Sequence, residues 1–531
     1  MKRHIRQAVV LVIVLAGCFP PAARAQYLDR IGLTALQAAT TNLNGAGVTV
    51  GQAEAALDYN ASPLPFEVSP AGANQPTGLF TWIEGSSPYI LPPTTATTYP
   101  NSIGVESYHA INVASDFYGI PGGVATNVAH VNNYEADTFY NYYISKNLAI
   151  TERIVNQSFT FGTNDDSVNQ SYDNYAAQHN VLFVSGAGFN GDPVWSPATC
   201  YNGIGVGVFN NAGSPYGPTV DGRSKPDITA FGYQDTVTSY ATPEVSGAAA
   251  LLLQAGLRGD GGAGTNAATD IRTLKALLLN GAVKPADWTN SPSSPLHSRY
   301  GAGVLNVFNS YEQLAGGKNS YIASSSVALG GAHPPTGAVG TIGALSGWDF
   351  NTDTSSVIQD HVNHYYFNVT NSENNARFMA TATLVWNRQN GQTALNNLGL
   401  FLYNAANSNL VACSTSLVDN VQHIFMPQLP QGRYDLQVWK AGGTGTVSLS
   451  ETYALAWAFV SPTLSIAQSG ANAALTWPLY PAGFQAETAA NLNAPVWAAG
   501  GVPSPVITNR QNLVWVNATN AAQFFRLVQS P

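Results

Sequence analysis

The sequence predicts an α/β domain with a mainly parallel sheet, followed by a β-sandwich and a small C-terminal β module. Between residues 45 and 316, short and continuous apolar runs alternate with helix-like stretches. Such runs are typical of parallel strands that are buried on both faces. After residue 316, strand-like runs follow one another with Asn, Gly and Pro turns between them. A length of 531 residues is sufficient for several domains.

The region 45–316 is expected to form one α/β domain, because strands and helices alternate along it. The expected strands cover 48–50, 154–156, 181–184 and 204–208. The expected helices cover 106–117, 173–179 and 243–257, and the last of these has the strongest helical pattern.

The remaining chain is expected to form two β modules. A β-sandwich is expected over 317–458, with strands at 365–369, 380–386, 398–403 and 434–439. Pro462 marks a joint to a small module at 459–531. Its expected strands cover 463–466, 475–477, 514–516 and 524–527.

The N-terminus has the parts of a secretory signal peptide. Basic residues precede an apolar run at 8–17, and small residues at 23–25 offer a cleavage site. The apolar run is shorter than the roughly 20 residues that span a bilayer. We expect removal of 1–25, a short lead at 26–44, and a secreted protein without a transmembrane span. Cys18, preceded by Leu-Ala-Gly, offers the alternative of a lipid anchor at the cell envelope.

The composition argues against certain partners and against disulfide bonds. Charged residues make up 10% of the chain and the net charge is −9, so we expect no nucleic-acid partner. A monomer is expected. Only Cys200 and Cys413 follow the signal peptide, and they lie in different expected domains. This excludes a disulfide scaffold and predicts two buried, unpaired thiols.

Ser239 lies just before the strongest expected helix. At a helix N-terminus the free N–H groups and the dipole favour developing negative charge, as the attack of a nucleophile requires. The segment 239–247 (SYATPEVSG) resembles the nucleophile motif of the subtilisin (subtilase) family, G-T-S-M-A-T-P-H-V-S-G. Val237, Tyr240 and Glu244 replace the usual Gly, Met and His of that motif.

Two further segments resemble the same family. The segment 107–114 (SYHAINVA) is similar to S-x-H-G-T-H-V-A and places His109 on the catalytic histidine, while Ala110 and Asn112 differ. The segment 47–54 (GVTVGQAE) is similar to G-V-T-V-A-V-I-D and places Glu54 on the catalytic acid.

The order acid, histidine, serine is also that of the subtilisins. Glu54 would accept the imidazole N–H, one methylene farther from the backbone than the usual Asp. Asp58 is the alternative acid.

The resemblance covers about 45–316 and implies a subtilisin-like three-layer fold with C-terminal β-rich domains. It implies a serine endopeptidase of peptidase family S8 that cleaves polypeptides through a Glu54, His109 and Ser239 triad and an acyl-enzyme intermediate. No cofactor is expected to be required. Structural calcium, which many subtilases bind, stays open because no 12-residue calcium loop is visible.

The resemblance also suggests the groups that would stabilise the oxyanion and bind substrate. In 184–191 (VSGAGFNG), similar to V-A-A-A-G-N-x-G, Phe189 takes the position of the oxyanion Asn and Asn190 follows it. The expected oxyanion donors are the Asn190 side chain and the Ser239 N–H. Substrate binding is expected at Ser158, Phe159 and Thr160, as an edge strand that pairs with an extended peptide.

Two rival interpretations and one metal hypothesis accompany this reading. The departures from the family motifs also fit a catalytically impaired binding protein on a subtilase fold. A sedolisin-like acid serine peptidase could use Glu54 and Asp58 instead of His109. His361 and His364 resemble metal ligands, but no third ligand is evident, so no metal site is predicted and both are expected to be solvated.

Overall fold

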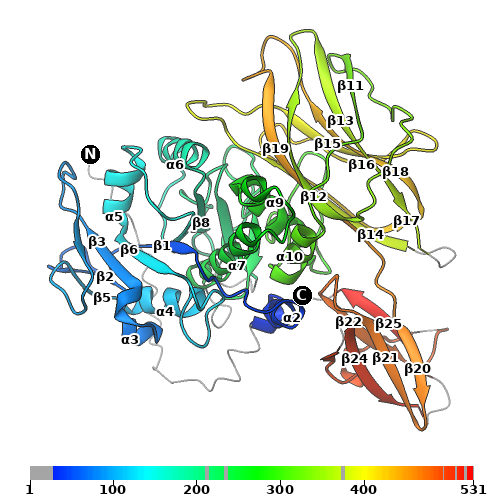
Figure 1. The fold of residues 1–531 in the computed structure, drawn as a ribbon, viewed down its shortest axis with the longest axis horizontal. Helices are drawn as coiled ribbons and strands as arrows, with labels where there is room; N and C mark the ends of the chain where they lie inside the picture. Colours follow the sequence, from blue (N-terminus) through cyan, green and yellow to red (C-terminus); the bar gives the residue numbers. More distant parts are fainter. Residues whose placement is uncertain are drawn as a thin grey trace.

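The structure is a computed structural model that describes residues 28–209, 214–232, 237–371, 377–493, 495–508, 511–518 and 523–529. The predicted signal peptide at 1–25, with Cys18, lies outside the described residues. Figure 1 shows an α/β body on the left, a β-sandwich at the upper right and a small β module at the lower right.

The α/β body is built on an eight-stranded sheet in the order β10-β9-β8-β7-β1-β6-β3-β4. Its strands are β1 Thr49–Glu54, β3 Phe80–Glu84, β4 Thr94–Ala96, β6 His130–Glu135, β7 Ile154–Gln157, β8 Leu182–Gly186, β9 Ile204–Val208 and β10 Ile228–Ala230. Every pair is parallel except β3 and β4. β2 (Leu64–Glu67) and β5 (Gly104–Glu106) form a separate parallel pair.

Helices connect and cover these strands. They are α2 Leu33–Ala39, α3 Pro70–Ala73, α4 Tyr108–Phe117, α5 Ala136–Thr138, α6 Asp166–His179, α7 Thr238–Arg258, α8 Thr265–Ala268, α9 Ile271–Gly281 and α10 Val307–Ala315. Short turns of other helix types are η1 Thr77–Leu79, η2 Phe139–Ile144 and, in the C-terminal module, η5 Ala499–Gly501.

Neighbouring residues of β7 show that the sheet is covered on both faces. Asn156 accepts a hydrogen bond from Ser246 of α7 at 2.9 Å, whereas Gln157 donates to Tyr172 of α6 at 2.7 Å. Because side chains alternate along a strand, α7 and α6 cover opposite faces. Helix α4 packs against α7. The predicted three-layer α/β fold with a mainly parallel sheet is confirmed.

The second body is a sandwich of two antiparallel sheets, in the orders β11-β13-β18-β15-β16 and β12-β19-β14-β17. Its strands are β11 Ala323–Ala328, β12 Ser346–Thr354, β13 Gln359–Val369, β14 Arg377–Trp386, β15 Leu398–Asn404, β16 Asn409–Ser414, β17 Val421–Pro430, β18 Gly432–Lys440 and β19 Ser450–Val460. Helix α9 packs against β14 and β19, which joins the sandwich to the α/β body. Strand β19 runs just past the predicted boundary at 458.

The C-terminal module has two small antiparallel sheets, β20-β21-β24-β23 and β22-β25. Its strands are β20 Ser465–Ser469, β21 Asn472–Pro478, β22 Phe484–Ala489, β23 Val506–Thr508, β24 Gln511–Asn517 and β25 Phe524–Gln529. A separate core that includes Leu475 and Trp477 lies inside it.

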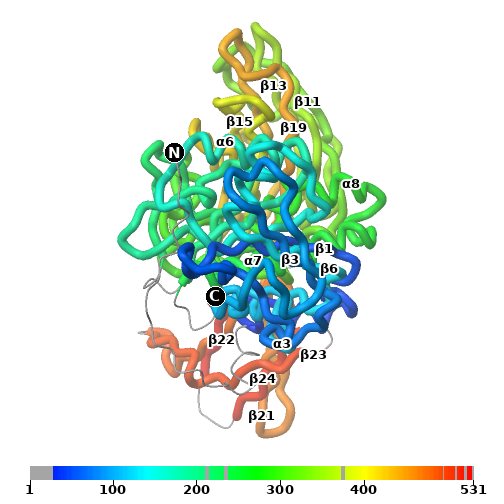
Figure 2. Tube along the Cα trace, turned by 90° about the vertical axis from the view of Figure 1, so that its left-hand side faces the viewer, coloured from blue at the N-terminus to red at the C-terminus, as the bar shows by residue number. Residues whose placement is uncertain are grey.

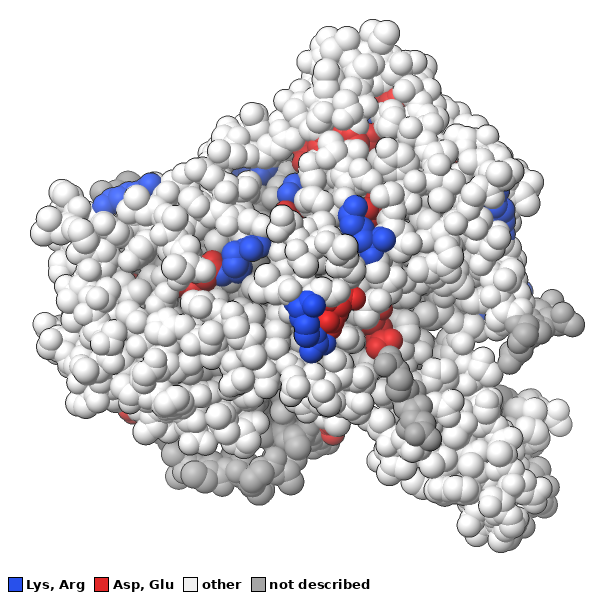
Figure 3. All heavy atoms as spheres, viewed as in Figure 1, with Lys and Arg blue, Asp and Glu red and all other residues white. Residues whose placement is uncertain are grey.

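The surface charges and the two cysteines can be compared with the predictions from the sequence. Lys and Arg side chains are few and separated on the face drawn in Figure 3. In the described parts of the chain, no helix is both long enough and apolar enough to cross a bilayer. Cys200 and Cys413 are unpaired, but only Cys200 is buried. Cys413 is partly exposed because it lies on β16, an edge strand of its sheet.

Candidate active site

The candidate site lies where β1 ends and where α4 and α7 begin, and β1 is a central strand of the sheet. Figures 1 and 2 both show β1 and α7 in the middle of the α/β body. Glu54 is the last residue of β1, His109 is the second residue of α4, and Ser239 is the second residue of α7. The carboxyl ends of parallel strands are where open α/β sheets place their ligands. The Ser107 side chain caps α4 by accepting a hydrogen bond from the Ala110 N–H.

Glu54 and His109 form the closest contact between predicted catalytic residues. Nδ1 of His109 lies 2.8 Å from Oε2 of Glu54, whose side chain has no exposed surface, while the imidazole is 14% exposed. An ionised carboxylate only accepts hydrogen bonds, so Nδ1 carries the proton and Nε2 is an acceptor in the neutral ring. A general base needs this tautomer.

Ser239 is half-buried in the first turn of α7. The residue before this helix is Val237, and no side chain caps the helix there, so the N–H groups of the first turn are not occupied by a capping side chain. Among the described residues, no hydrogen bond joins Ser239 to His109, and such contacts are often long without substrate. The Tyr240 ring lies 6.2 Å from the His109 ring.

Helix α7 begins five residues earlier than the sequence pattern predicts, at Thr238, and therefore contains Pro243. Pro243 has no N–H to donate to the carbonyl of Ser239, four residues before it. Oγ of Ser158 donates to that carbonyl instead, at 2.8 Å. Because of the proline, the carbonyl of the candidate nucleophile has no partner within the helix. The hydroxyl of Ser158 occupies this acceptor.

Two departures from the family motifs contact each other. Nδ2 of Asn112 donates to the hydroxyl of Tyr240 at 3.2 Å. The sequence shows both substitutions, but their pairing is visible only in the fold, because they are separated by 128 positions. The contact ties α4 to α7 next to His109 and Ser239.

The loop after β8 carries the predicted oxyanion donor. Gly188 has a φ of +117°, which other residues rarely adopt, and its carbonyl accepts a hydrogen bond from Oγ1 of Thr238 at 2.9 Å. This bond ties the loop to the residue before Ser239. Phe189 is half-buried and Asn190 is exposed.

Strand β7 ends at Gln157, so the three predicted substrate-binding residues follow it as a loop and not as a regular strand. Ser158, Phe159 and Thr160 are buried. Ser158 is held by Nδ2 of Asn156 at 3.0 Å as well as by the Ser239 carbonyl. The side chain of Ser158 therefore ties this loop to the main chain of the candidate nucleophile.

Asp58, the alternative acid, lies in an exposed turn. Its Oδ1 accepts a hydrogen bond from the backbone N–H of Asn60 at 2.8 Å. Glu54, and not Asp58, is the carboxylate that contacts His109.

The two histidines of the metal hypothesis are separately paired. His361 and His364 lie three apart on β13, so they point to opposite faces of the strand. Nδ1 of His361 bonds to Asp353, and Nδ1 of His364 lies 2.8 Å from Asp435. No group of three potential metal ligands occurs among the described residues. The expectation that both are solvated is wrong, because the side chain of His364 has no exposed surface.

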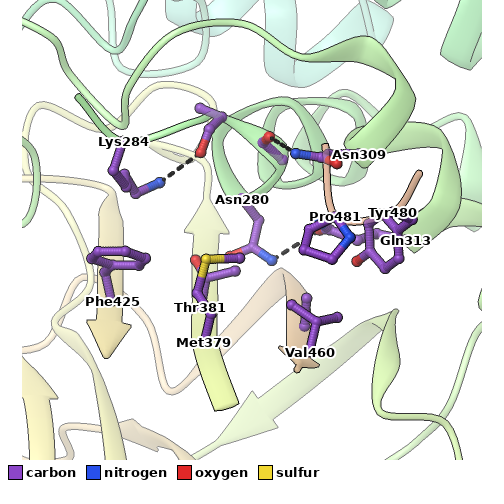
Figure 4. A pocket seen from close by; sticks show the side chains of 13 residues that line it. Asn280, Lys284, Asn309, Gln313, Met379, Thr381, Phe425, Val460, Tyr480 and Pro481 are labelled. Carbon is purple, nitrogen blue, oxygen red and sulfur yellow. Dashed lines mark hydrogen bonds between the residues drawn. The ribbon is translucent and has the colours of Figure 1, made fainter. Parts of the chain in front are cut away.

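A pocket lies at the contact between the α/β body and the two β bodies (Figure 4). Nζ of Lys284 donates to the Ala282 carbonyl at 3.0 Å and lies 5.3 Å from the ring of Trp288 and 5.5 Å from that of Phe425. Within the described residues, no carboxylate pairs with Lys284. Burial lowers the pKa of Lys284 to about 7. The pocket contains none of the predicted catalytic residues.

The structure thus brings together, at one edge of a parallel sheet, the start of α7 with Ser239 and the start of α4, where His109 pairs with the buried Glu54. Residues 94–303 match the model of the subtilase family, peptidase S8. This part of the chain is a subtilase-family serine-peptidase domain. The matched range contains His109 and Ser239 and begins after Glu54.

Solved structures show more distant likenesses. Tripeptidyl peptidase 2 is 13% identical with a TM-score of 0.32, over 73% of this chain and 43% of that protein. The epidermin leader peptide processing serine protease of Staphylococcus aureus is 16% identical with a TM-score of 0.37, over 59% of this chain and 84% of that protein. The chain thus spans less than half the length of tripeptidyl peptidase 2. No curated protein sequence matches the chain.

Proposed function

We propose that the chain is a secreted serine endopeptidase in which Ser239 is the nucleophile, His109 the general base and Glu54 the acid that orients the base. The 2.8 Å contact between Nδ1 of His109 and Oε2 of Glu54, next to the uncapped start of α7, carries this proposal. Secretion would follow removal of residues 1–25. Polypeptides are the substrates that a subtilase-family domain implies.

The proposed reaction has two halves. Oγ of Ser239 attacks the scissile carbonyl carbon while Nε2 of His109 takes the hydroxyl proton. The C–N bond breaks, the imidazolium protonates the leaving amine, and the acyl group stays on Ser239 as an ester. Water then attacks this ester, again losing a proton to His109, which returns it to Ser239 as the acid product leaves. Glu54 accepts the Nδ1–H throughout and stabilises the imidazolium.

The oxyanion would lie at the start of α7. The Ser239 N–H belongs to the first turn, where the helix offers no backbone acceptor, and the helix dipole adds positive potential there. Asn190 is the proposed second donor, in a loop that Thr238 ties to the same helix end.

Replacing Asn190 by Ala is expected to lower kcat by about 10²-fold with little change in KM, because the lost donor acts on the transition state. Steady-state kinetics on a peptide substrate would measure both constants. Asp192→Ala, in the same loop, is the control that should retain the parent kcat. An unchanged kcat in Asn190→Ala would assign the second donor to another group.

The chain without residues 1–25 should cleave unfolded casein, and Ser239→Ala should lower the rate by about 10⁴-fold or more. A fluorophosphonate probe should label Ser239 in the folded parent, with the adduct located by mass spectrometry. Parent activity that survives Ser239→Ala would refute the assignment of the nucleophile.

The second candidate function is a binding protein on an impaired protease fold. Phe189 occupies the position of the oxyanion Asn and is half-buried, while Asn190 is exposed, which favours this alternative. Absence of both casein cleavage and probe labelling in folded protein would support it. Labelling without casein cleavage would instead indicate a functional nucleophile with a restricted substrate.

A further inference from the structure

A buried glutamine lies two residues before the proposed acid. Gln52 and Glu54 are both in β1, and because side chains alternate along a strand they share one face. Gln52 has no exposed surface and lies in the interior of the sheet, between β6 and β7. A buried amide without partners costs about 1–3 kcal/mol, so its polar atoms should be bonded.

The Gln52 amide is bonded on both sides. Nε2 donates to Oε1 of Glu54 at 2.8 Å and to the carbonyl of Ala110 at 2.9 Å. Oε1 accepts a hydrogen bond from the hydroxyl of Tyr118 at 2.5 Å. One carboxylate oxygen of Glu54 therefore contacts Gln52, and the other contacts His109.

The partners determine which way the amide points. Rotating the Gln52 amide by half a turn would place its oxygen against the Glu54 carboxylate and the Ala110 carbonyl, both of which only accept hydrogen bonds. Tyr118 reinforces the observed orientation. Burial and the charge of Glu54 raise the pKa of Tyr118 well above its usual value, so its hydroxyl keeps its proton.

Tyr118 follows the last residue of α4, while His109 is near the start of the same helix. The chain of contacts from Tyr118 through Gln52 to Glu54 therefore links β1 to the C-terminal end of α4. The contact between Glu54 and His109 links β1 to its N-terminal end. Both ends of the helix that carries the base are thus held to the strand that carries the acid.

We propose that Gln52 and Tyr118 are positioning residues that hold Glu54 so that Oε2 faces His109. The extra methylene of Glu, relative to the family's Asp, adds a rotatable bond to the acid. The hydrogen bond from Gln52 removes this freedom by securing Oε1. This inference rests on the proposed function, because it assigns Gln52 and Tyr118 to the orientation of the acid in that reaction.

The test compares Gln52→Met and Tyr118→Phe with a matched control. Tyr172→Phe removes a buried tyrosine hydroxyl that bonds to a buried glutamine, Gln157, on the opposite face of the neighbouring strand. We expect the rate of fluorophosphonate labelling at Ser239 to fall about 10–100-fold in Gln52→Met and about 10-fold in Tyr118→Phe. Tyr172→Phe should stay within about 2-fold of the parent.

A double-mutant cycle distinguishes an effect of Gln52 through Glu54 from a general loss of stability. If Gln52 acts through Glu54, Gln52→Met should change the labelling rate less than about 2-fold in a Glu54→Ala background. The downfield proton resonance of the His109 Nδ1–H offers a readout that needs no substrate. It should shift or broaden in Tyr118→Phe and stay unchanged in Tyr172→Phe.

The outcomes distinguish this inference from the proposed function. An active parent with equal labelling rates in Tyr118→Phe and Tyr172→Phe, and an unchanged Nδ1–H resonance, would overturn the positioning role. The positioning role would also be overturned if Gln52→Met lowered the labelling rate by the same factor in the parent and in the Glu54→Ala background. A parent that neither cleaves nor is labelled would refute the proposed function, while the resonance would still test the Gln52 contact.

Discussion

Replacing Glu54 by Gln is expected to lower kcat by about 10⁴-fold while KM changes little. Nε2 of Gln52 donates to Oε1 of Glu54, so the new amide must present its oxygen to Gln52. Its NH₂ group would then face Nδ1 of His109 and donate to it. The imidazole would carry its proton on Nε2, where it cannot accept the proton of Ser239.

Glu54→Asp is the matched variant that keeps the charge. The shorter side chain draws the carboxylate away from both His109 and Gln52, so an intermediate loss of about 10–100-fold is expected. Peptidase kinetics on one substrate would rank parent, Glu54→Asp and Glu54→Gln in that order. A Glu54→Gln variant with nearly parental kcat would show that Glu54 does not set the tautomer of His109.

The largest expected change in stability comes from Lys284→Met. Lys284 is buried at the contact between the α/β body and the sandwich, and no carboxylate among the described residues pairs with it. Its pKa is about 7 in the folded protein, compared with about 10.4 for an exposed lysine. Methionine would fill a similar volume without a charge, so the free energy of unfolding should rise by at most roughly 4 kcal/mol at neutral pH.

The sign of the pH dependence follows from these two pKa values. Between about pH 10 and pH 7 the unfolded chain binds a proton at Lys284 that the folded chain does not, so the parent loses stability as the pH falls. The advantage of Lys284→Met should therefore be small near pH 11, grow towards pH 7 and stay level below it. Denaturant unfolding of both proteins across this range would measure it.

Lys275→Met is the contrasting control. Lys275 is also buried, but it lies 3.1 Å from Asp227, which it helps to neutralise. Its removal should destabilise the fold, because it leaves a buried carboxylate with one partner fewer. If Lys284→Met and the parent had the same free energy of unfolding at neutral pH, the prediction would be wrong. Water or another group would then offset the cost of burying the Lys284 amine.

Local pattern was sufficient to predict the fold class and the family. The predicted strands at 154–156, 181–184 and 204–208 became β7, β8 and β9. Buried parallel strands are mostly apolar, and the polar Asn156 and Gln157 of β7 are tolerated because each is hydrogen-bonded to the helix that covers its face. Boundaries were less predictable. The sequence pattern places the start of α7 at Pro243, since proline favours a first helical turn, yet the helix begins at Thr238. The Ser158 hydrogen bond to the Ser239 carbonyl compensates for the proline there.

The sequence by itself determined the order of the motifs and therefore the residue types available for catalysis. The motif order already favoured Glu54 over Asp58 as the partner of His109, and the structure shows that contact. The tertiary structure alone decided the other partners, Gln52 for Glu54 and Tyr240 for Asn112. A glutamine in a buried strand is a visible signal, but the sequence does not say which acceptor it will meet. Most of these contacts join residues tens of positions apart, and their distances depend on how β1, α4 and α7 pack. Local propensity carries no information about that packing.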